Sequence, residues 1–330
     1  MRKYIALGLV LLSAWMLTVN MVTSRAGSAS TPSLADMQRI VGAPAKCTYT
    51  ASGETKALCG GRLVSSGIRV YHKAPGRHSI EYVTGPLRGV VVVSDGKHTW
   101  RWDPKCNSVT AAESVPAQSV TQLRLMLKNH DIEQTRDGTV AGKPATLLVV
   151  RTMTGAIRKR LWLDEKTYIV LKSEEYSTGG KLLSSTAFKT INYKAAVADS
   201  LFRQPDDMNV GRNAGKALTR DELSKAVGFK VLIPRYVPRS FKLDAYRLYD
   251  CPCGCGHKSA YIRYTNGMDS ISVFETAAGT GCMKMSGCIM PGGQCGVKNQ
   301  TAMMTTGGRT FIVIGDVPSQ ELKRITNSLR

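Results

Sequence analysis

Apolar and polar residues alternate along most of the chain between residues 47 and 193, and this alternation predicts a series of short β-strands. Residues that favour tight turns separate the strands, as Asp95-Gly96 does between two alternating segments. Two segments break the alternation with apolar residues at helical spacing: residues 32–42, which have a Thr-Pro start, and residues 116–129. The pattern therefore predicts a long antiparallel meander crossed by one or two helices.

A polar segment with Asp, Asn and Gly, residues 206–218, separates this meander from a second unit. Thr219 and Glu222 match a capping box, which predicts a short helix directly after the segment. Asn266-Gly267 lies between two alternating segments and predicts a hairpin, and a final amphipathic helix is expected near the C-terminus. The predicted fold class is α+β in two domains. The division is residues 1–29 as signal peptide or membrane anchor, 30–205 as N-terminal domain, 206–218 as linker and 219–330 as C-terminal domain.

The N-terminus has the features of an export signal. Arg2 and Lys3 precede an apolar run, residues 5–23, and small residues follow it, with Ala26 and Ala29 as candidate cleavage points. The run is longer than a signal-peptide core of about 7–15 residues, so an uncleaved inner-membrane anchor is the alternative. Either reading predicts a periplasmic protein.

The charge of the chain narrows the choice of partners. Its 330 residues include 45 Lys and Arg against 24 Asp and Glu, a formal net charge of +21. A surface this basic attracts anions, such as nucleic acid, anionic lipid or an acidic protein. Because export removes the protein from the cytoplasm, we expect no nucleic-acid partner.

Nine cysteines fit an oxidising compartment, and their odd number leaves at least one thiol unpaired within a monomer. Cys47 and Cys59 are equidistant from Gly53, so a hairpin turning at residues 52–54 would place them opposite each other. We therefore expect a Cys47–Cys59 disulfide, with Cys106 as the unpaired thiol.

The six remaining cysteines form two triplets in segments with many glycines. Close neighbours seldom bridge each other, so disulfides between the triplets are predicted, and their connectivity stays open. The members are Cys251, Cys253 and Cys255, and Cys282, Cys288 and Cys295. A metal site is the alternative, because Cys251, Cys253, Cys255 and His257 are soft ligands within one seven-residue segment.

No motif for catalysis is present: the chain has no GxSxG, HExxH, P-loop or GxGxxG sequence, and its five histidines are scattered. The CxxCH signature of covalent haem and a thioredoxin-like CxxC are also missing from the sequence. We therefore expect a binding protein that is not an enzyme and has no cofactor.

Five segments of the N-terminal domain carry a family resemblance: RVYHKAPGRHSIEYV, VVVSDGKHTWRWDP, AGKPATLLVV, KRLWLDEKTYIVLKSEEYSTGGKLLSSTAF and SLFRQPDD. They resemble the LolA/RseB superfamily of periplasmic proteins. In the C-terminal domain, YTNGMDSISVFE and VIGDVPSQELKRITNSL resemble the second domain of the sigma-E regulatory protein family RseB/MucB. The cysteine-rich segments 251–257 and 281–295 are additions to the family pattern.

The resemblance implies a LolA-like curved antiparallel half-barrel, closed by helices around an apolar cavity, followed by a smaller α+β domain. It implies an envelope-stress regulator that binds the extracytoplasmic part of a membrane anti-sigma factor and is released by a lipidic or lipopolysaccharide-like ligand. We therefore expect an RseB-like regulator with an anti-sigma factor, or another membrane-protein segment, as partner. A LolA-like carrier of lipid or lipoprotein acyl chains is the alternative, and a cysteine-rich metal-handling module is the second alternative.

Two sets of side chains are candidates for contact with the ligand. Trp100 and Trp102 alternate with Arg101 and so share one face of a strand, where they either pack in the core or line the cavity. The cavity candidates are Trp100, Trp102, Leu123, Leu127 and Trp162. The candidates for contact with an anionic group, with a solvated surface as their alternative, are Lys73, Arg77, Arg158 and Arg160.

Overall fold

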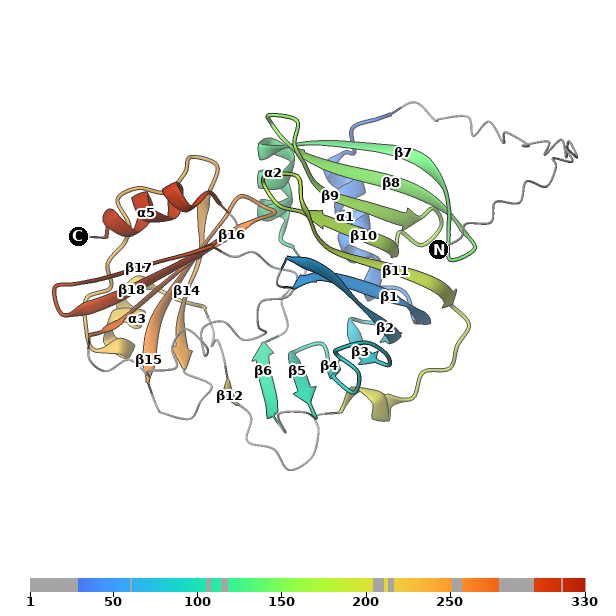
Figure 1. Cartoon of the computed structure of the whole chain (residues 1–330), viewed down its shortest axis with the longest axis horizontal. Helices are drawn as coiled ribbons and strands as arrows, with labels where there is room; N and C mark the ends of the chain where they lie inside the picture. Colours follow the sequence, from blue (N-terminus) through green and yellow to red (C-terminus); the bar gives the residue numbers. More distant parts are fainter. Residues whose placement is uncertain are drawn as a thin grey trace, which may run out of the picture.

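The described residues form two β-sheets, one of twelve strands and one of six. The computed structural model describes residues 29–59, 61–104, 108–113, 118–203, 211–212, 217–250, 257–278, 300–315 and 317–329. The larger sheet is strongly curved, and the smaller sheet lies beside it (Figure 1). The predicted α+β architecture, a large curved antiparallel sheet with helices followed by a smaller domain, is confirmed.

The larger sheet is a meander of neighbouring hairpins in which the first long strand also pairs with the last. Its strands are β1 (Tyr49–Cys59), β2 (Arg62–Lys73), β3 (Arg77–Tyr82), β4 (Val91–Ser94), β5 (His98–Asp103), β6 (Ser108–Glu113), β7 (His130–Val140), β8 (Lys143–Thr152), β9 (Ile157–Asp164), β10 (Val170–Tyr176), β11 (Leu182–Asn192) and β12 (Gly211–Arg212). Their order across the sheet is β12-β6-β5-β4-β3-β2-β1-β11-β10-β9-β8-β7. All pairs are antiparallel except β12 with β6. The predicted turn at Asp95-Gly96 is confirmed between β4 and β5.

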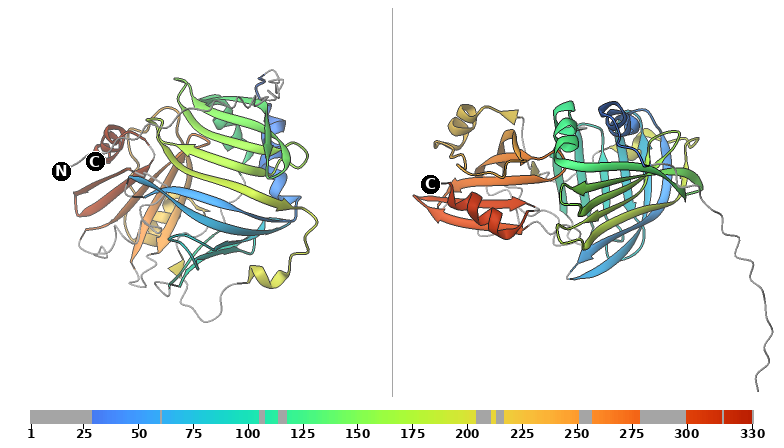
Figure 2. Two further views of the ribbon diagram at one scale, coloured as in Figure 1. Left: turned by 45° about the vertical axis from the view of Figure 1, so that its right-hand side comes forward. Right: turned by 90° about the horizontal axis from the view of Figure 1, so that it is seen from above.

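Helices α1 (Leu34–Gly42) and α2 (Val120–Asn129) pack on the same face of the larger sheet (Figure 2). Each begins with a capping box, in which Ser33 or Ser119 accepts a hydrogen bond from a backbone N–H of the first turn. The 3-10 turn η1 (Ala43–Ala45) continues α1. The buried core under these helices consists of Met37, Ile40, Leu123, Met126, Ile132, Leu148, Val150 and Leu163.

The smaller sheet forms the core of the C-terminal domain. Its strands, in order across the sheet, are β13 (Ala217–Leu218), β14 (Lys242–Asp250), β15 (Lys258–Thr265), β16 (Ser270–Ala277), β18 (Arg309–Gly315) and β17 (Gln300–Thr306). Helices α3 (Arg220–Val227) and α5 (Ser319–Asn327) contribute Leu223, Leu322 and Ile325 to the buried core. The predicted capping box of α3 and the hairpin between β15 and β16 are both confirmed.

The hairpin predicted at residues 52–54 is wrong. β1 passes through this segment without a turn and pairs with β2 along its whole length. Gly53 lies where β1 shifts register against β11, and a Cβ at this position would overlap the carbonyl oxygen of Ala187. The glycine therefore permits a close backbone approach inside a strand, which a sequence pattern does not distinguish from a turn.

The predicted Cys47–Cys59 disulfide is wrong for the same reason. An extended strand rises about 3.3 Å per residue, so cysteines at its two ends lie far beyond the Cα separation of about 7 Å that a disulfide tolerates. Cys47 is a free thiol whose pKa is raised by burial, whereas Cys59 is disulfide-bonded. Cys106 and the two C-terminal triplets lie outside the described residues.

Among the helices of the described ranges, none combines the length and the apolar character that a membrane crossing requires. The predicted signal or anchor, residues 5–23, lies outside the described residues. Parts of the predicted linker are extended: residues 211–212 form β12 beside β6, and residues 217–218 form β13 beside β14.

Candidate functional site

A cavity of about 800 Å³ lies between the end of α1 and the larger sheet. Its apolar wall includes Val41 and Pro44 from α1 and η1, Ile68 and Val70 from β2, and Phe188 from β11. Pockets that hold small organic ligands have volumes of roughly 300–1,000 Å³ and mainly apolar walls. The size and the wall therefore fit a ligand with a hydrocarbon part.

The register of four neighbouring strands places the cavity side chains on one face. Tyr49 of β1 pairs with His72 of β2, His72 pairs with His78 of β3, and His78 pairs with Ser94 of β4. Because side chains alternate between the two faces of a strand, the residues two positions away along each strand, such as Val70 and Ile80, face the same space. Tyr49, Val70, His72, His78, Ile80 and Ser94 all line the cavity, whereas Ala51 and Val92 of the same face do not.

Two histidines belong to the polar part of the cavity, together with the hydroxyl side chains of Thr55, Ser94, Thr99 and Thr186. The His72 ring stacks on Tyr49, with 4.9 Å between centroids and 11° between planes, and its Nδ1 is 2.9 Å from the carbonyl oxygen of Cys47. Burial lowers the pKa of both His72 and His78, so both rings are neutral near neutral pH. Burial also raises the pKa of the Tyr49 hydroxyl to about 12.

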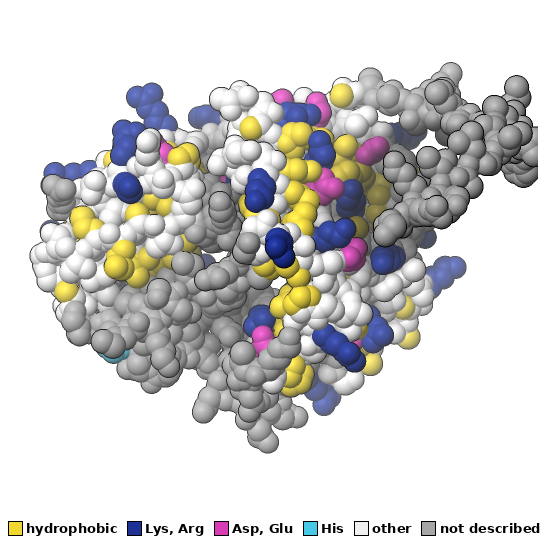
Figure 3. Space-filling view, viewed as in Figure 1, with side chains coloured by type: hydrophobic (Ala, Val, Ile, Leu, Met, Phe, Trp, Pro, Cys, Tyr) yellow, Lys and Arg dark blue, Asp and Glu magenta, His cyan; other side chains and the backbone are white. Residues whose placement is uncertain are grey.

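No Lys, Arg, Asp or Glu occurs among the described residues that line this cavity. The outer surface is different, because Figure 3 shows Lys and Arg side chains scattered over the face that it presents. The chain therefore combines a strongly basic exterior with an uncharged interior space.

The five predicted cavity residues do not line this space. Trp100 lies next to Thr99, which does line it, so Trp100 and Trp102 point to the opposite face of β5, where Trp100 packs against Val93. Leu123 and Leu127 belong to the solid core under the helices. Trp162 donates a hydrogen bond to Asp137 over 2.7 Å, and the Lys172 Nζ atom lies 3.9 Å from its ring centroid.

The predicted anion contacts are each paired with a carboxylate of the chain itself. Lys73 and Arg77 both donate to one oxygen of Asp199, over 2.9 and 2.7 Å, on the face opposite to His72 and His78. The hydrogen bond from Lys73 is the largest of the effects that lower the pKa of Asp199. Arg160 lies 3.7 Å from Glu174. These cations therefore stabilise the N-terminal domain and do not face the cavity.

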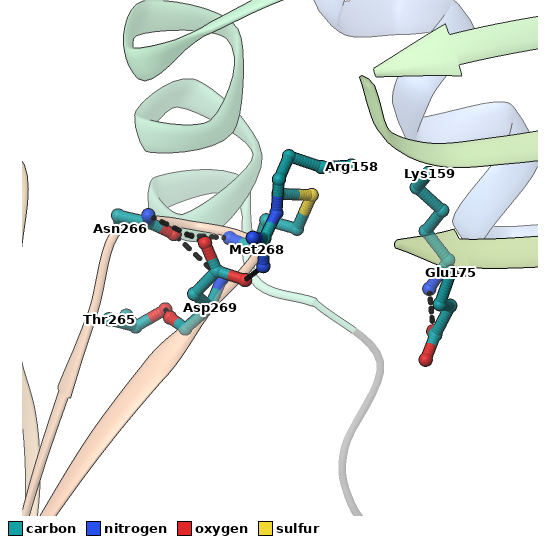
Figure 4. A network of polar contacts seen from close by, with 7 residues as sticks. All are labelled: Arg158, Lys159, Glu175, Thr265, Asn266, Met268 and Asp269. Atoms are coloured by element: carbon teal, nitrogen blue, oxygen red, sulfur yellow. Dashed lines mark hydrogen bonds and ion pairs between the residues drawn. The ribbon is translucent and has the colours of Figure 1, made fainter. Parts of the chain in front are cut away.

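Arg158, the fourth predicted anion contact, joins the two domains. Its guanidinium group lies 3.0 Å from Asp269, which follows the hairpin turn between β15 and β16 (Figure 4). The Arg158 side chain is 3% exposed and the Asp269 side chain 17%. The adjacent Lys159 points to Glu175 within its own domain, 2.7 Å away.

The β15–β16 turn also docks on α2. Gln122 donates to Asp244 over 2.9 Å, and Asn129 donates to the carbonyl oxygens of Ser240 and Asn266. Gly267 has a φ of +98°, and a Cβ there would overlap the backbone of α2. In Figure 1, α2 lies between the two sheets. Among the described residues, this helix and Arg158 of β9 therefore both contact the C-terminal domain.

His72 and His78 were not among the cavity residues predicted from the sequence, although the sequence contains a signal for them. Ile68, Val70 and His72 stand at every second position of one predicted strand, and His78, Ile80 and Tyr82 do so in the next. Each histidine therefore shares a face with two apolar side chains. The pattern alone does not say which face the helices cover.

The alternative metal site stays a prediction. Its cysteines lie outside the described residues, and within the described ranges there is no cluster of three or more metal-ligating side chains.

Comparison with known proteins adds the family context. Residues 65–205 match the family model described as outer membrane lipoprotein carrier protein LolA. The crystal structure of MucB is similar with a TM-score of 0.54, at 18% identity, over 88% of this chain and 95% of that chain. The chain has the two-domain fold of MucB. The resemblance to the RseB/MucB proteins is therefore confirmed at the level of fold.

Two structures of complexes agree with this comparison. The Pseudomonas aeruginosa MucA/MucB complex gives a TM-score of 0.58 at 18% identity, over 89% of this chain and 96% of that chain. MucB in complex with MucA(peri) gives 0.57 at 19% identity, over 90% and 98%. No curated protein sequence matches the chain. The MucB likeness spans both domains, whereas the LolA model covers the larger sheet alone.

Proposed function

We propose that this protein is an RseB-like binding protein of the bacterial periplasm, which holds the extracytoplasmic segment of an anti-sigma factor or of another membrane protein. The observation that carries the proposal is the match with MucB across both domains, because MucB itself is found in complex with MucA. The match with the LolA family model, by contrast, covers residues 65–205 only. The comparisons therefore support a role in binding.

The lipidic ligand of the proposal belongs in the N-terminal cavity. Its volume of about 800 Å³ and its apolar wall support a hydrocarbon chain as occupant. Removing this wall from water is favourable by roughly 25 cal/mol for each Å² of apolar surface that the ligand covers.

A physical connection exists between the cavity and the C-terminal domain. Val41 of α1 lines the cavity, and Met37 and Ile40 of the same helix share a core with Leu123 and Met126 of α2. The adjoining face of α2 contacts Asp244 of β14 through Gln122 and the β15–β16 turn through Asn129. A ligand that shifts α1 would therefore change the contact between the domains. By thermodynamic linkage, a partner that favours one domain arrangement would change the affinity for the ligand.

The binding test uses the exported protein, purified after secretion, and the extracytoplasmic segments of anti-sigma factors from the same genome. We expect the immobilised protein to retain one such segment. Calorimetry should give one bound segment for each protein chain, either in a 1:1 complex or in a symmetric assembly of several chains. A lipid extract should lower the affinity. If no anti-sigma segment is retained, with or without lipid, the regulatory function is refuted.

The second candidate function is lipid or lipoprotein transport, which the LolA match and the cavity both favour. A carrier would extract an acylated protein from donor membranes and deliver it to acceptor vesicles without any polypeptide partner. Transfer of a radiolabelled lipoprotein between two vesicle populations would distinguish this function from regulation.

A further inference from the structure

The cavity lining has an unusual electrostatic character for so basic a protein. Its described lining residues that can ionise are Tyr49, His72, His78 and Tyr82, and α1, η1, β4, β5 and β11 contribute none. A charged group placed in such a space loses its hydration and finds no counter-ion, which is costly. The lining therefore disfavours a ligand whose charge would lie inside the cavity.

The hydrogen bond of His72 fixes which ring atom can meet a ligand. The carbonyl oxygen of Cys47 only accepts, so Nδ1 of His72 donates to it and carries the proton. In the neutral ring Nε2 is then an acceptor. Burial lowers the pKa of the opposite ring, His78, so that ring is also neutral near neutral pH and has one acceptor nitrogen. Two rings that are directly paired across β2 and β3 thus each keep one nitrogen as an acceptor.

We propose that the cavity takes an uncharged amphiphile, a hydrocarbon chain that carries a hydroxyl or amide N–H donor, and that His72 and His78 accept the hydrogen bond from this donor. This inference rests on the proposed function and specifies its ligand. The aliphatic wall formed by Val41, Ile68, Val70 and Ile80 surrounds the chain, and the two rings select the polar group. A ligand without a donor displaces water from these acceptors without replacing its hydrogen bonds, and so binds more weakly.

Acid reverses this selectivity. The ordinary pKa of histidine is about 6.5, and burial lowers the pKa of both rings, so protonation takes place below that pH. Protonation turns each acceptor into a donor and adds positive charge to the cavity. The neighbouring ionisable groups are Tyr49 of β1, Tyr82 of β3 and the Cys47 thiol, and burial raises the pKa of all three, so they stay neutral. An anionic amphiphile therefore gains affinity in acid while the neutral one loses it.

The test compares three probes of equal chain length below their aggregation concentrations: monopalmitoylglycerol with hydroxyl donors, methyl palmitate without donors, and the anion hexadecyl phosphate. Affinities are measured by displacement of a pyrene-labelled monoacylglycerol from the exported protein. At pH 7.5 we expect monopalmitoylglycerol to bind about tenfold more tightly than methyl palmitate, the value of one well-placed hydrogen bond. At pH 5.0 this difference disappears and hexadecyl phosphate binds best.

Three variants isolate the histidines. His72→Phe should abolish the preference for the hydroxyl probe, and His72→Gln, whose amide oxygen accepts but does not titrate, should keep the preference and weaken its pH dependence. The matched control is His98→Gln, because His98 is exposed and lies outside the cavity lining. Should His72→Phe fold poorly, His78→Phe and the pH profile of the unaltered protein provide the same comparison.

The outcomes separate the inference from the function on which it rests. Equal binding of all three probes at both pH values would overturn the selectivity and leave the cavity as a lipid site. A preference for hexadecyl phosphate at pH 7.5 would also overturn it. Absence of binding by every probe would refute the lipid part of the proposed function together with the inference.

Discussion

Burial acts on three histidines of the N-terminal domain in the same direction. It lowers the pKa of His72, His78 and His130, and for His130 this effect outweighs the nearby Asp269 carboxylate, which acts in the opposite direction. A histidine that binds its proton less readily in the folded state than in the unfolded state makes folding sensitive to acid. These residues therefore connect the chemistry of single side chains to the pH range in which the protein is stable.

We predict that the free energy of unfolding decreases between pH 7.5 and pH 5.5. The unfolded histidines bind protons near pH 6.5, and because the folded pKa values are lower, the unfolded state binds more protons in this window. Stability is thus complete above pH 6.5 and is lost as the pH falls towards the folded pKa values. Urea unfolding at the two pH values measures the difference.

His130→Gln should reduce this pH dependence, because the side chain that binds a proton more readily in the unfolded state is removed. Carboxylates such as Glu174 and Glu175, whose pKa values lie below the ordinary range, lose their contribution only at lower pH. Identical unfolding curves at pH 7.5 and 5.5 would contradict the assignment of these histidines as buried and neutral.

The core residue Leu148 gives a second prediction at this scale. Its side chain is fully buried between α2 and the sheet. Leu148→Ala removes buried methyl groups and leaves a cavity, so we expect a loss of about 2–5 kcal/mol in the free energy of unfolding. Met153→Ala is the matched control, because this side chain is 72% exposed and should change stability by less than about 0.5 kcal/mol. Chemical denaturation of both variants gives the comparison.

At the scale of elements, local patterns predicted most of the helices and hairpins. The capping box at Thr219, the turn at Asn266-Gly267 and the final helix were all read correctly from short segments. Gly53 was misread because a glycine in a strand and a glycine in a turn look alike in sequence. What distinguishes them is the distant carbonyl of Ala187, which a local pattern does not contain. The same limit applies to the cavity, because alternation groups Val70 with His72 but does not identify the covered face.

The docking of the β15–β16 turn on α2 gives a prediction for Gly267. Gly267→Ala forces a positive φ on alanine and overlaps the backbone of α2, so we expect it to weaken the domain contact by about 2 kcal/mol or more. Gly308→Ala is the control, since Gly308 also has a positive φ but has open space around its Cβ position. Its expected cost is about 1 kcal/mol. Hydrogen exchange of the α2 amides should increase in the first variant and not in the second.

At the scale of the whole molecule, α2 has two roles, of which the sequence reveals only the first. Leu123 and Met126 anchor it in the N-terminal core, while Gln122 and Asn129 contact the other domain. Its apolar stripe predicted the first role. The second depends on how two separate domains meet, and the polar residues beside the apolar stripe look like an ordinary solvated surface. Arg158 was predicted to contact an anion for the same reason. Its carboxylate partner lies 111 residues away, so the local sequence does not show the pair.

The Arg158–Asp269 pair yields the prediction that tests this domain arrangement. Arg158→Met leaves the Asp269 carboxylate without this counter-ion, which costs about 3–5 kcal/mol, and Asp269→Asn removes one partner of the buried Arg158 guanidinium, which also lowers stability. The double variant removes both charges and should recover much of this loss. We therefore expect each single variant to increase the radius of gyration in small-angle X-ray scattering and to increase the rate of proteolysis in the linker. In the double variant, both increases should be smaller. Arg160→Met is the control, because its pairing with Glu174 lies within one domain and is partly exposed. Unchanged scattering in both single variants would show that other contacts of α2 hold the domains together.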